Sequence, residues 1–99
     1  MLFIREGTTT PVRMQLLQED DNIPLSLSGC TVVMKLYDET GNEAFSFTCD
    51  IVDEENGIIE FDPSSLTEGI YERKFIITFP DGTQLALPNR TREFIAVWR

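Results

Sequence analysis

Residues 66–82 read L-T-E-G-I-Y-E-R-K-F-I-I-T-F-P-D-G, and this stretch decides the fold. A run of β-branched and aromatic residues follows Gly69, and the turn-forming residues P-D-G end it. Successive side chains of a strand point to opposite faces, so one set along residues 69–79 faces inward. That set comprises Tyr71, Arg73, Phe75, Ile77 and Phe79. The stretch therefore predicts a long strand whose inner face carries much of the aromatic core.

The beginning of this strand predicts a tyrosine corner. Tyr71 comes shortly after Leu66 and Gly69, where the chain enters the strand. In a tyrosine corner the ring lies in the core and its hydroxyl bonds to backbone upstream, a device that belongs to Greek-key sandwiches. We therefore expect Leu66, Gly69 and Tyr71 to form a structural corner.

The rest of the chain has the pattern of an all-β protein. Turn signals recur about every 8–12 residues, and no helix of three turns fits without crossing a glycine, a proline or a strict alternation. The residues expected in the core are Val12, Met14, Leu16, Val32, Met34, Leu36, Phe45, Phe47, Ile59, Phe61, Phe75, Ile77 and Phe79. The sequence predicts an antiparallel immunoglobulin-like sandwich of about seven or eight strands in two sheets, with Greek-key connections. We expect it to form a single domain over residues 1–99.

Charge and hydropathy limit the partners. The chain carries 17 acidic and 8 basic residues, a formal net charge of −9. Binding phosphate groups requires clustered Lys or Arg, so we expect neither nucleic acid nor an anionic membrane as a partner. The sequence shows no apolar window of ~20 residues and no signal-peptide pattern, so synthesis in the cytoplasm without a signal peptide is expected.

The two cysteines are expected to be free thiols, with a disulfide as the alternative. If the strands that carry them form a hairpin, Tyr37 faces Ala44 and Val32 faces Cys49. Cys30 is then diagonal to Cys49 at ~7–8 Å, which is too far for an unstrained bridge. Disulfides are also rare in reducing compartments.

No residue set predicts a catalytic, cofactor or metal site. The chain has no histidine, which removes Ser-His-Asp and Cys-His chemistry and most transition-metal sites, so we do not expect an enzyme. The acidic loops Glu19-Asp20-Asp21 and Asp53-Glu54-Glu55 could offer oxygen ligands to calcium. They lack the spacing of a calcium loop, however, and charged turns that keep the protein soluble are the simpler interpretation. Asn89-Arg90-Thr91 matches the N-glycosylation pattern, which is frequent by chance.

Four residues are candidates for a protein interface: Tyr37, Arg73, Ile76 and Trp98. Aromatic and branched side chains left outside a sandwich are enriched in protein contacts. Arg73 has two interpretations, because its parity places it among inward aromatic side chains. It either extends its charged end to the rim of the core or forms an ion pair with an acidic residue, at an interface or at the edge of the core.

Several motifs occur in a familiar order. They are G-T-T-T-P-V-R-M-Q-L-L-Q at residues 7–18, N-I-P-L-S-L-S-G leading into C-T-V-V-M-K-L at 22–36, L-T-E-G-I-Y-E-R-K-F-I-I-T-F at 66–79, P-D-G-T at 80–83, and F-I-A-V-W at 94–98. Together they resemble the N-terminal immunoglobulin-like domain of the upper baseplate proteins of tailed phages. The resemblance covers nearly the whole chain.

The resemblance implies a non-enzymatic structural module of a phage or prophage virion, in the tail or baseplate. Its expected partners are proteins, either copies of itself in a homo-oligomer or other phage tail proteins. Its expected location is the virion, after synthesis in a bacterial cytoplasm. The alternative is a carbohydrate-binding or adhesion module that uses Tyr37 or Trp98 as a stacking platform.

Overall fold

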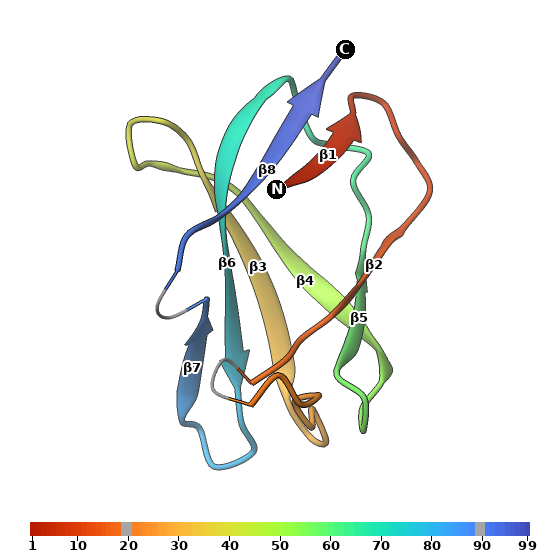
Figure 1. Ribbon diagram of the computed structural model, residues 1–99, viewed down its shortest axis with the longest axis vertical. Helices are drawn as coiled ribbons and strands as arrows, with labels where there is room; N and C mark the ends of the chain where they lie inside the picture. Colours follow the sequence, from red (N-terminus) through yellow and green to blue (C-terminus); the bar gives the residue numbers. More distant parts are fainter. Residues whose placement is uncertain (19–20, 89–90) are drawn as a thin grey trace.

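A computed structural model describes residues 1–18, 21–88 and 91–99 of the chain (Figure 1). Its strands are β1 (Leu2–Arg5), β2 (Val12–Gln15), β3 (Thr31–Tyr37), β4 (Glu43–Asp53), β5 (Ile58–Phe61), β6 (Gly69–Thr78), β7 (Gln84–Leu87) and β8 (Glu93–Trp98). The described residues form no helix, and so none that is long and apolar enough to cross a membrane. The all-β prediction is confirmed.

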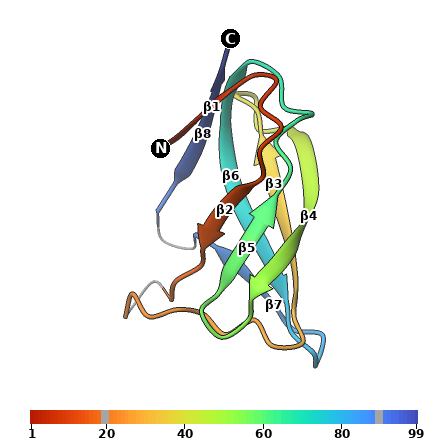
Figure 2. The same cartoon turned by 90° about the vertical axis from the view of Figure 1, so that its right-hand side faces the viewer.

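The eight strands form one curled, mixed sheet with the shape of a half-barrel (Figures 1 and 2). The strand order is β1-β8-β6-β3-β4-β5-β2, and β7 pairs with β6 beside this path. The long strand β6 pairs with β8 over its first half and with β7 over its second half. It also pairs with β3 along its other edge. The stretch that decides the fold therefore lies at the centre of the most extensively paired part of the sheet.

Two features differ from the predicted antiparallel two-sheet sandwich. β1 is parallel to β8, whereas every other pair is antiparallel. A parallel pair needs a long crossover connection, and here the six strands between β1 and β8 provide it. The 11-residue strand β4 also joins the two halves, because it pairs with β3 over its first part and with β5 over its last part. The purely antiparallel arrangement was wrong for β1, and β4 makes the two halves one continuous sheet.

The β3–β4 hairpin differs from its predicted register at one end. Val32 pairs with Cys49 as expected, but a bulge beside Leu36 places Tyr37 opposite Glu43 instead of Ala44. Both cysteines are free thiols. Burial raises the pKa of Cys49 to about 11, so its thiol is neutral near pH 7 and packs as a small apolar group.

The core lies inside the curl of the sheet. Of the side chains expected there, those fully buried are Leu16, Val32, Met34, Leu36, Ile59, Phe61, Phe75 and Ile77. Those partly buried against them are Val12, Met14, Phe45, Phe47 and Phe79. The buried cluster also includes Ile4, Leu25, Leu27, Leu66, Leu87, Ile95 and Val97, which belong to β1, β7, β8 and the loops. One hydrophobic cluster thus connects both halves of the sheet.

Tyr71 has the geometry of the expected corner. Its ring is buried, and the hydroxyl lies 3.0 Å from the carbonyl oxygen of Thr67, to which it donates. A Cβ at Gly69 would lie 3.0 Å from this hydroxyl, so glycine leaves room for the ring. Leu66, also buried, donates its amide to the carbonyl of Pro63 at 3.0 Å.

Replacing Tyr71 by phenylalanine is expected to lower the free energy of unfolding by ~0.5–1.5 kcal/mol, the net contribution of one hydrogen bond. Urea denaturation monitored by tryptophan fluorescence measures this change. Tyr37→Phe is the matched control, because the Tyr37 hydroxyl makes no hydrogen bond within the described residues. Equal stabilities of Tyr71→Phe and the wild type would show that the corner bond contributes nothing.

Acidic side chains organise several turns by accepting bonds from nearby groups. Asp38 Oδ1 accepts from the hydroxyl of Thr40 at 2.6 Å and from the amides of Thr40 and Asn42 at 3.0 Å each. These bonds, the Thr40 hydroxyl first, hold the pKa of Asp38 below its usual value. Hydrogen bonds from Asn56, Ser64 and Thr83 likewise lower the pKa values of Asp53, Asp62 and Asp81, respectively.

These lowered pKa values predict a loss of stability in acid. A carboxyl whose pKa is lower in the folded state stabilises the fold above its unfolded pKa of ~3.9, and this contribution disappears as the pH falls through the folded pKa. We expect the melting temperature to decrease as the pH is lowered past about 4. This decrease should be less steep in Asp38→Asn than in the wild type. Thermal melts between pH 7 and 2 test this, with Glu39→Gln in the same loop as the control. Parallel pH profiles for Asp38→Asn and the wild type would contradict it.

Candidate protein interaction surface

The outer face of the β1-β8-β6 end of the sheet is apolar and exposed. Phe3 pairs with Ala96, and Ala96 pairs in turn with Ile70, so the three side chains form one row across three strands. Phe3 is 67% exposed and Ile70 is 48% exposed. Large apolar side chains on one strand row leave a continuous hydrophobic surface in water.

The rows on either side extend this surface. Trp98 is 49% exposed and lies opposite Arg5, two residues along β8 from Ala96. Phe94 lies on the other side of Ala96, opposite Glu72 of β6. We call the surface formed by Phe3, Ile70, Phe94, Ala96 and Trp98 the β1–β8 face.

Arginine side chains cover parts of the aromatic rings on this face. The guanidinium carbon of Arg5 lies 5.0 Å from the centre of the Trp98 ring, and that of Arg92 lies 5.2 Å from the centre of Phe94. Arg92 also binds Glu72 through two nitrogens, at 3.2 and 3.1 Å. These hydrogen bonds lower the pKa of Glu72 and raise that of Arg92. An apolar centre with arginine at its rim has the composition of a protein interface.

The structure brings three of the four predicted interface residues to the outer side of the sheet. Trp98 lies on the β1–β8 face. Tyr37 pairs across the sheet with Glu72 and has the Lys74 ammonium 5.9 Å from its ring. Ile76 lies further along β6 and is half-buried. The three residues therefore share a side of the sheet, and only Trp98 belongs to the exposed apolar surface.

Sequence reasoning missed Phe3, Phe94 and Ala96. Residues 2–5 form a short apolar segment, and nothing in such a segment indicates which strand it pairs with. For Phe94 and Ala96 the available signal is the alternation over residues 93–98, which places them on the face opposite Ile95 and Val97. Pairing of β1 with β8 turns isolated outward side chains into a surface.

Arg73, the fourth candidate, lies on the inner side of the sheet. Its guanidinium carbon is 5.1 Å from the centre of the Phe75 ring, and Nη1 is 3.8 Å from the sulfur of Met14. Nε is buried and has no hydrogen-bond partner in the described part of the chain. Burial lowers the pKa of Arg73, and the charge of Glu93 opposes this shift. Among the described residues Arg73 makes no ion pair within 4.0 Å, so the ion-pair interpretation has no support there.

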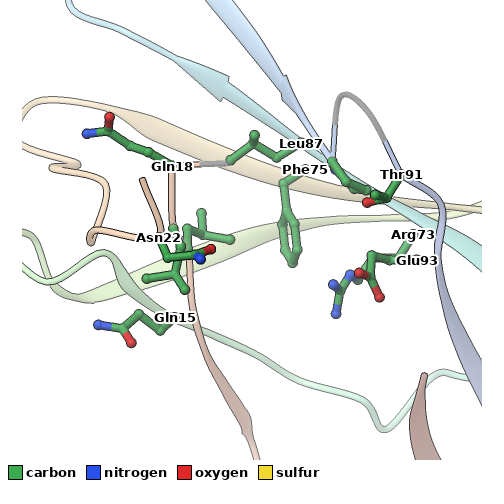
Figure 3. Close-up of a pocket in the computed structure, with 11 residues that line it drawn as sticks. Gln15, Gln18, Asn22, Arg73, Phe75, Leu87, Thr91 and Glu93 are labelled. Carbon is green, nitrogen blue, oxygen red and sulfur yellow. The ribbon is translucent and has the colours of Figure 1, made fainter. Parts of the chain in front are cut away.

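Arg73 borders an open cavity of about 220 Å³ between β2 and strands β6 to β8. Figure 3 shows Gln15, Gln18 and Asn22 at one end, and Arg73 and Glu93 at the other, with the Phe75 ring between them. The lining residues that the structure describes include no histidine, cysteine, serine or lysine. They therefore offer amide, hydroxyl and charged groups for binding.

The acidic loops have no metal-site geometry where the structure describes them. Over residues 1–18, 21–88 and 91–99, no group of three or more His, Cys, Asp or Glu side chains could hold a metal ion. Asp53 instead accepts bonds from the amide and side chain of Asn56. Glu19-Asp20 of the other acidic loop, and Asn89-Arg90 of the glycosylation pattern, lie outside the described residues.

The fold and its surface define an all-β domain, a curled mixed sheet with an exposed apolar outer face. It is similar to the N-terminal domain of phage TP901-1 ORF48, with a TM-score of 0.69, 13% identity, and coverage of 100% of this chain and 85% of that chain. CopC from Methylosinus trichosporium OB3b has a TM-score of 0.56 at 13% identity, with 99% and 85% covered. No protein-family model and no curated protein sequence matches the chain. At this identity the likeness shows a shared fold.

Proposed function

We propose that this chain is a non-enzymatic structural module of a phage or prophage particle, in its tail or baseplate. It acts through protein contacts of the β1–β8 face and is located in the virion. The fold shared with the N-terminal domain of phage TP901-1 ORF48 supports the phage setting. We further propose that the sheet is a variant of the immunoglobulin-like Greek-key sandwich, because its two halves enclose one core while β4 runs through both.

The β1–β8 face is the observation that carries the proposal of a docking module. Burying apolar surface favours association, and aromatic side chains with arginine at their margins contribute most strongly. The face joins aromatic side chains from both terminal strands in one surface. It is thus built as part of the sheet and does not depend on a loop.

The carbohydrate-binding alternative has less support. A sugar stacks on an aromatic ring through its open face. Arg5 lies over the Trp98 ring, and Tyr37 is half-buried beside Lys74. A sugar would have to displace a cation from either ring before it could stack.

Mass spectrometry of purified particles tests the proposal. Particles are prepared from a lysogen that carries the coding region, in wild-type form and with Phe3→Asp. We expect the wild-type chain in the particles and the Phe3→Asp chain largely in the soluble fraction, because a carboxylate within the apolar face prevents docking. Ile23→Asp is the matched control, since Ile23 is also exposed but lies on a loop away from the face.

Circular dichroism of both purified variants verifies that they fold. Absence of the wild-type chain from particles would refute the virion role. Normal incorporation of folded Phe3→Asp would exclude the β1–β8 face as the docking surface.

A further inference from the structure

Charge is distributed unevenly along this chain. Residues 38–68 contain no basic residue, and their acidic residues are Asp38, Glu39, Glu43, Asp50, Asp53, Glu54, Glu55, Glu60, Asp62 and Glu68. After residue 68 the basic residues outnumber the acidic ones. The acidic segment includes β4 and β5, whereas the later segment includes β6, β7 and β8. The two ends of the sheet therefore differ in charge.

The acidic end has a second outward surface with a small apolar centre. Asp50 of β4 pairs with Glu60 of β5. Val52 is 41% exposed and lies in a bulge opposite the half-buried Ile58. We call the surface formed by Asp50, Val52, Ile58 and Glu60 the β4–β5 face. Only one cation pairs with it in the described residues, namely Arg13, which lies 3.4 Å from Glu60.

The two faces are on different sides of the molecule. β1 and β8 occupy one end of the strand order, and β4, β5 and β2 occupy the other. Because the sheet curls around its core, its outer surface points in different directions at the two ends. Figure 2 shows β1 and β8 on one side of the domain and β4 on the other. A single molecule can therefore use both faces at once.

We propose that the β1–β8 face binds the β4–β5 face of a second copy of this chain. Arg5 at the first face complements Asp50 of the second, whereas Arg92 and Glu60 each have a partner within one copy. The apolar centres of both faces meet beside this pair of charges. This assignment rests on the proposed assembly role and names the partner. The contact joins two different faces, so it repeats from copy to copy and gives a ring or a filament.

The net charge of −9 opposes association at long range. At physiological ionic strength the Debye length is ~8 Å, so repulsion between whole molecules is screened more than contacts inside the interface. Association is therefore expected near physiological salt and is expected to weaken when the salt is removed.

Sedimentation velocity over a range of concentrations tests the proposal on the purified chain. We expect wild-type mass to rise beyond that of a dimer. Arg5→Glu and Asp50→Lys should each weaken association by about tenfold, or ~1.4 kcal/mol. Mixing these two variants should restore association, because both the native and the exchanged charge pairs are then complementary. Glu39→Lys is the matched control, as it changes the charge as Asp50→Lys does and lies on a loop outside both faces.

Association that is restored in the mixture, and is weak in either variant alone, supports the contact between different faces. A wild type that stays monomeric at all concentrations, growth that stops at a dimer, or a mixture as weak as the single variants would overturn it. If the wild-type chain is monomeric yet present in purified particles, this inference fails and the proposed function stands. If it associates but is absent from particles, the proposed function fails instead.

Discussion

Replacing Gly57 by alanine is expected to lower the free energy of unfolding by ~3 kcal/mol or more, because two separate costs combine. Gly57 has a φ of +65°, which side-chain-bearing residues rarely adopt. A Cβ there would lie 2.6 Å from the carbonyl oxygen of Leu25 and 2.7 Å from that of Leu16. These backbones cannot move freely, because Leu16 donates to Gly57 O at 2.8 Å and Leu25 donates to Leu16 O at 2.9 Å. Urea denaturation measures the loss.

Gly41→Ala separates the two costs. Gly41 has a φ of +85°, but a Cβ added there meets no atom within 4 Å. We expect this variant to lose only about 1–2 kcal/mol, the backbone strain alone. If Gly57→Ala cost no more than Gly41→Ala, that result would contradict the close approach of the Leu16 and Leu25 backbones to Gly57.

Replacing Phe75 by alanine is expected to cost ~3–5 kcal/mol. Phe75 is 2% exposed, lies at the centre of β6, and pairs across the sheet with Met34 and Leu87. Removing its ring leaves a cavity beneath β6 and removes the surface over which the Arg73 guanidinium lies. Urea denaturation of the purified variant measures the change in free energy.

Phe3→Ala is the appropriate comparison for Phe75→Ala, since it removes the same ring from an exposed position. We expect it to change stability by less than about 0.5 kcal/mol. If Phe75→Ala left the free energy of unfolding unchanged, or if both variants lost the same amount, Phe75 would not point into the core. The alternate side chains of β6 would then be the inward ones.

The local elements could be predicted from the sequence because their signals are local. Alternation over residues 69–79 indicated the inward side chains of β6, and the spacing of Leu66, Gly69 and Tyr71 indicated the corner. Residues 80–82 indicated a turn through Pro, Asp and Gly. Such patterns depend on neighbours in the chain, so they do not require knowledge of the sheet order.

The sheet order and the interaction surface depend on contacts between distant segments. The parallel pairing of β1 with β8 and the shared strand β4 leave no signature in either segment alone. Phe3 could therefore not be linked with Ile70 and Ala96. Arg73 was placed at a possible interface because arginine seldom faces a core, whereas the cavity beside β2 accommodates it.

A reconstruction of the intact particle at side-chain resolution tests the central claim most directly. We predict that Phe3, Ile70 and Trp98 lie against a neighbouring protein and exclude water. A chain located in the particle with these three side chains facing solvent, and held instead through another surface, would contradict the account.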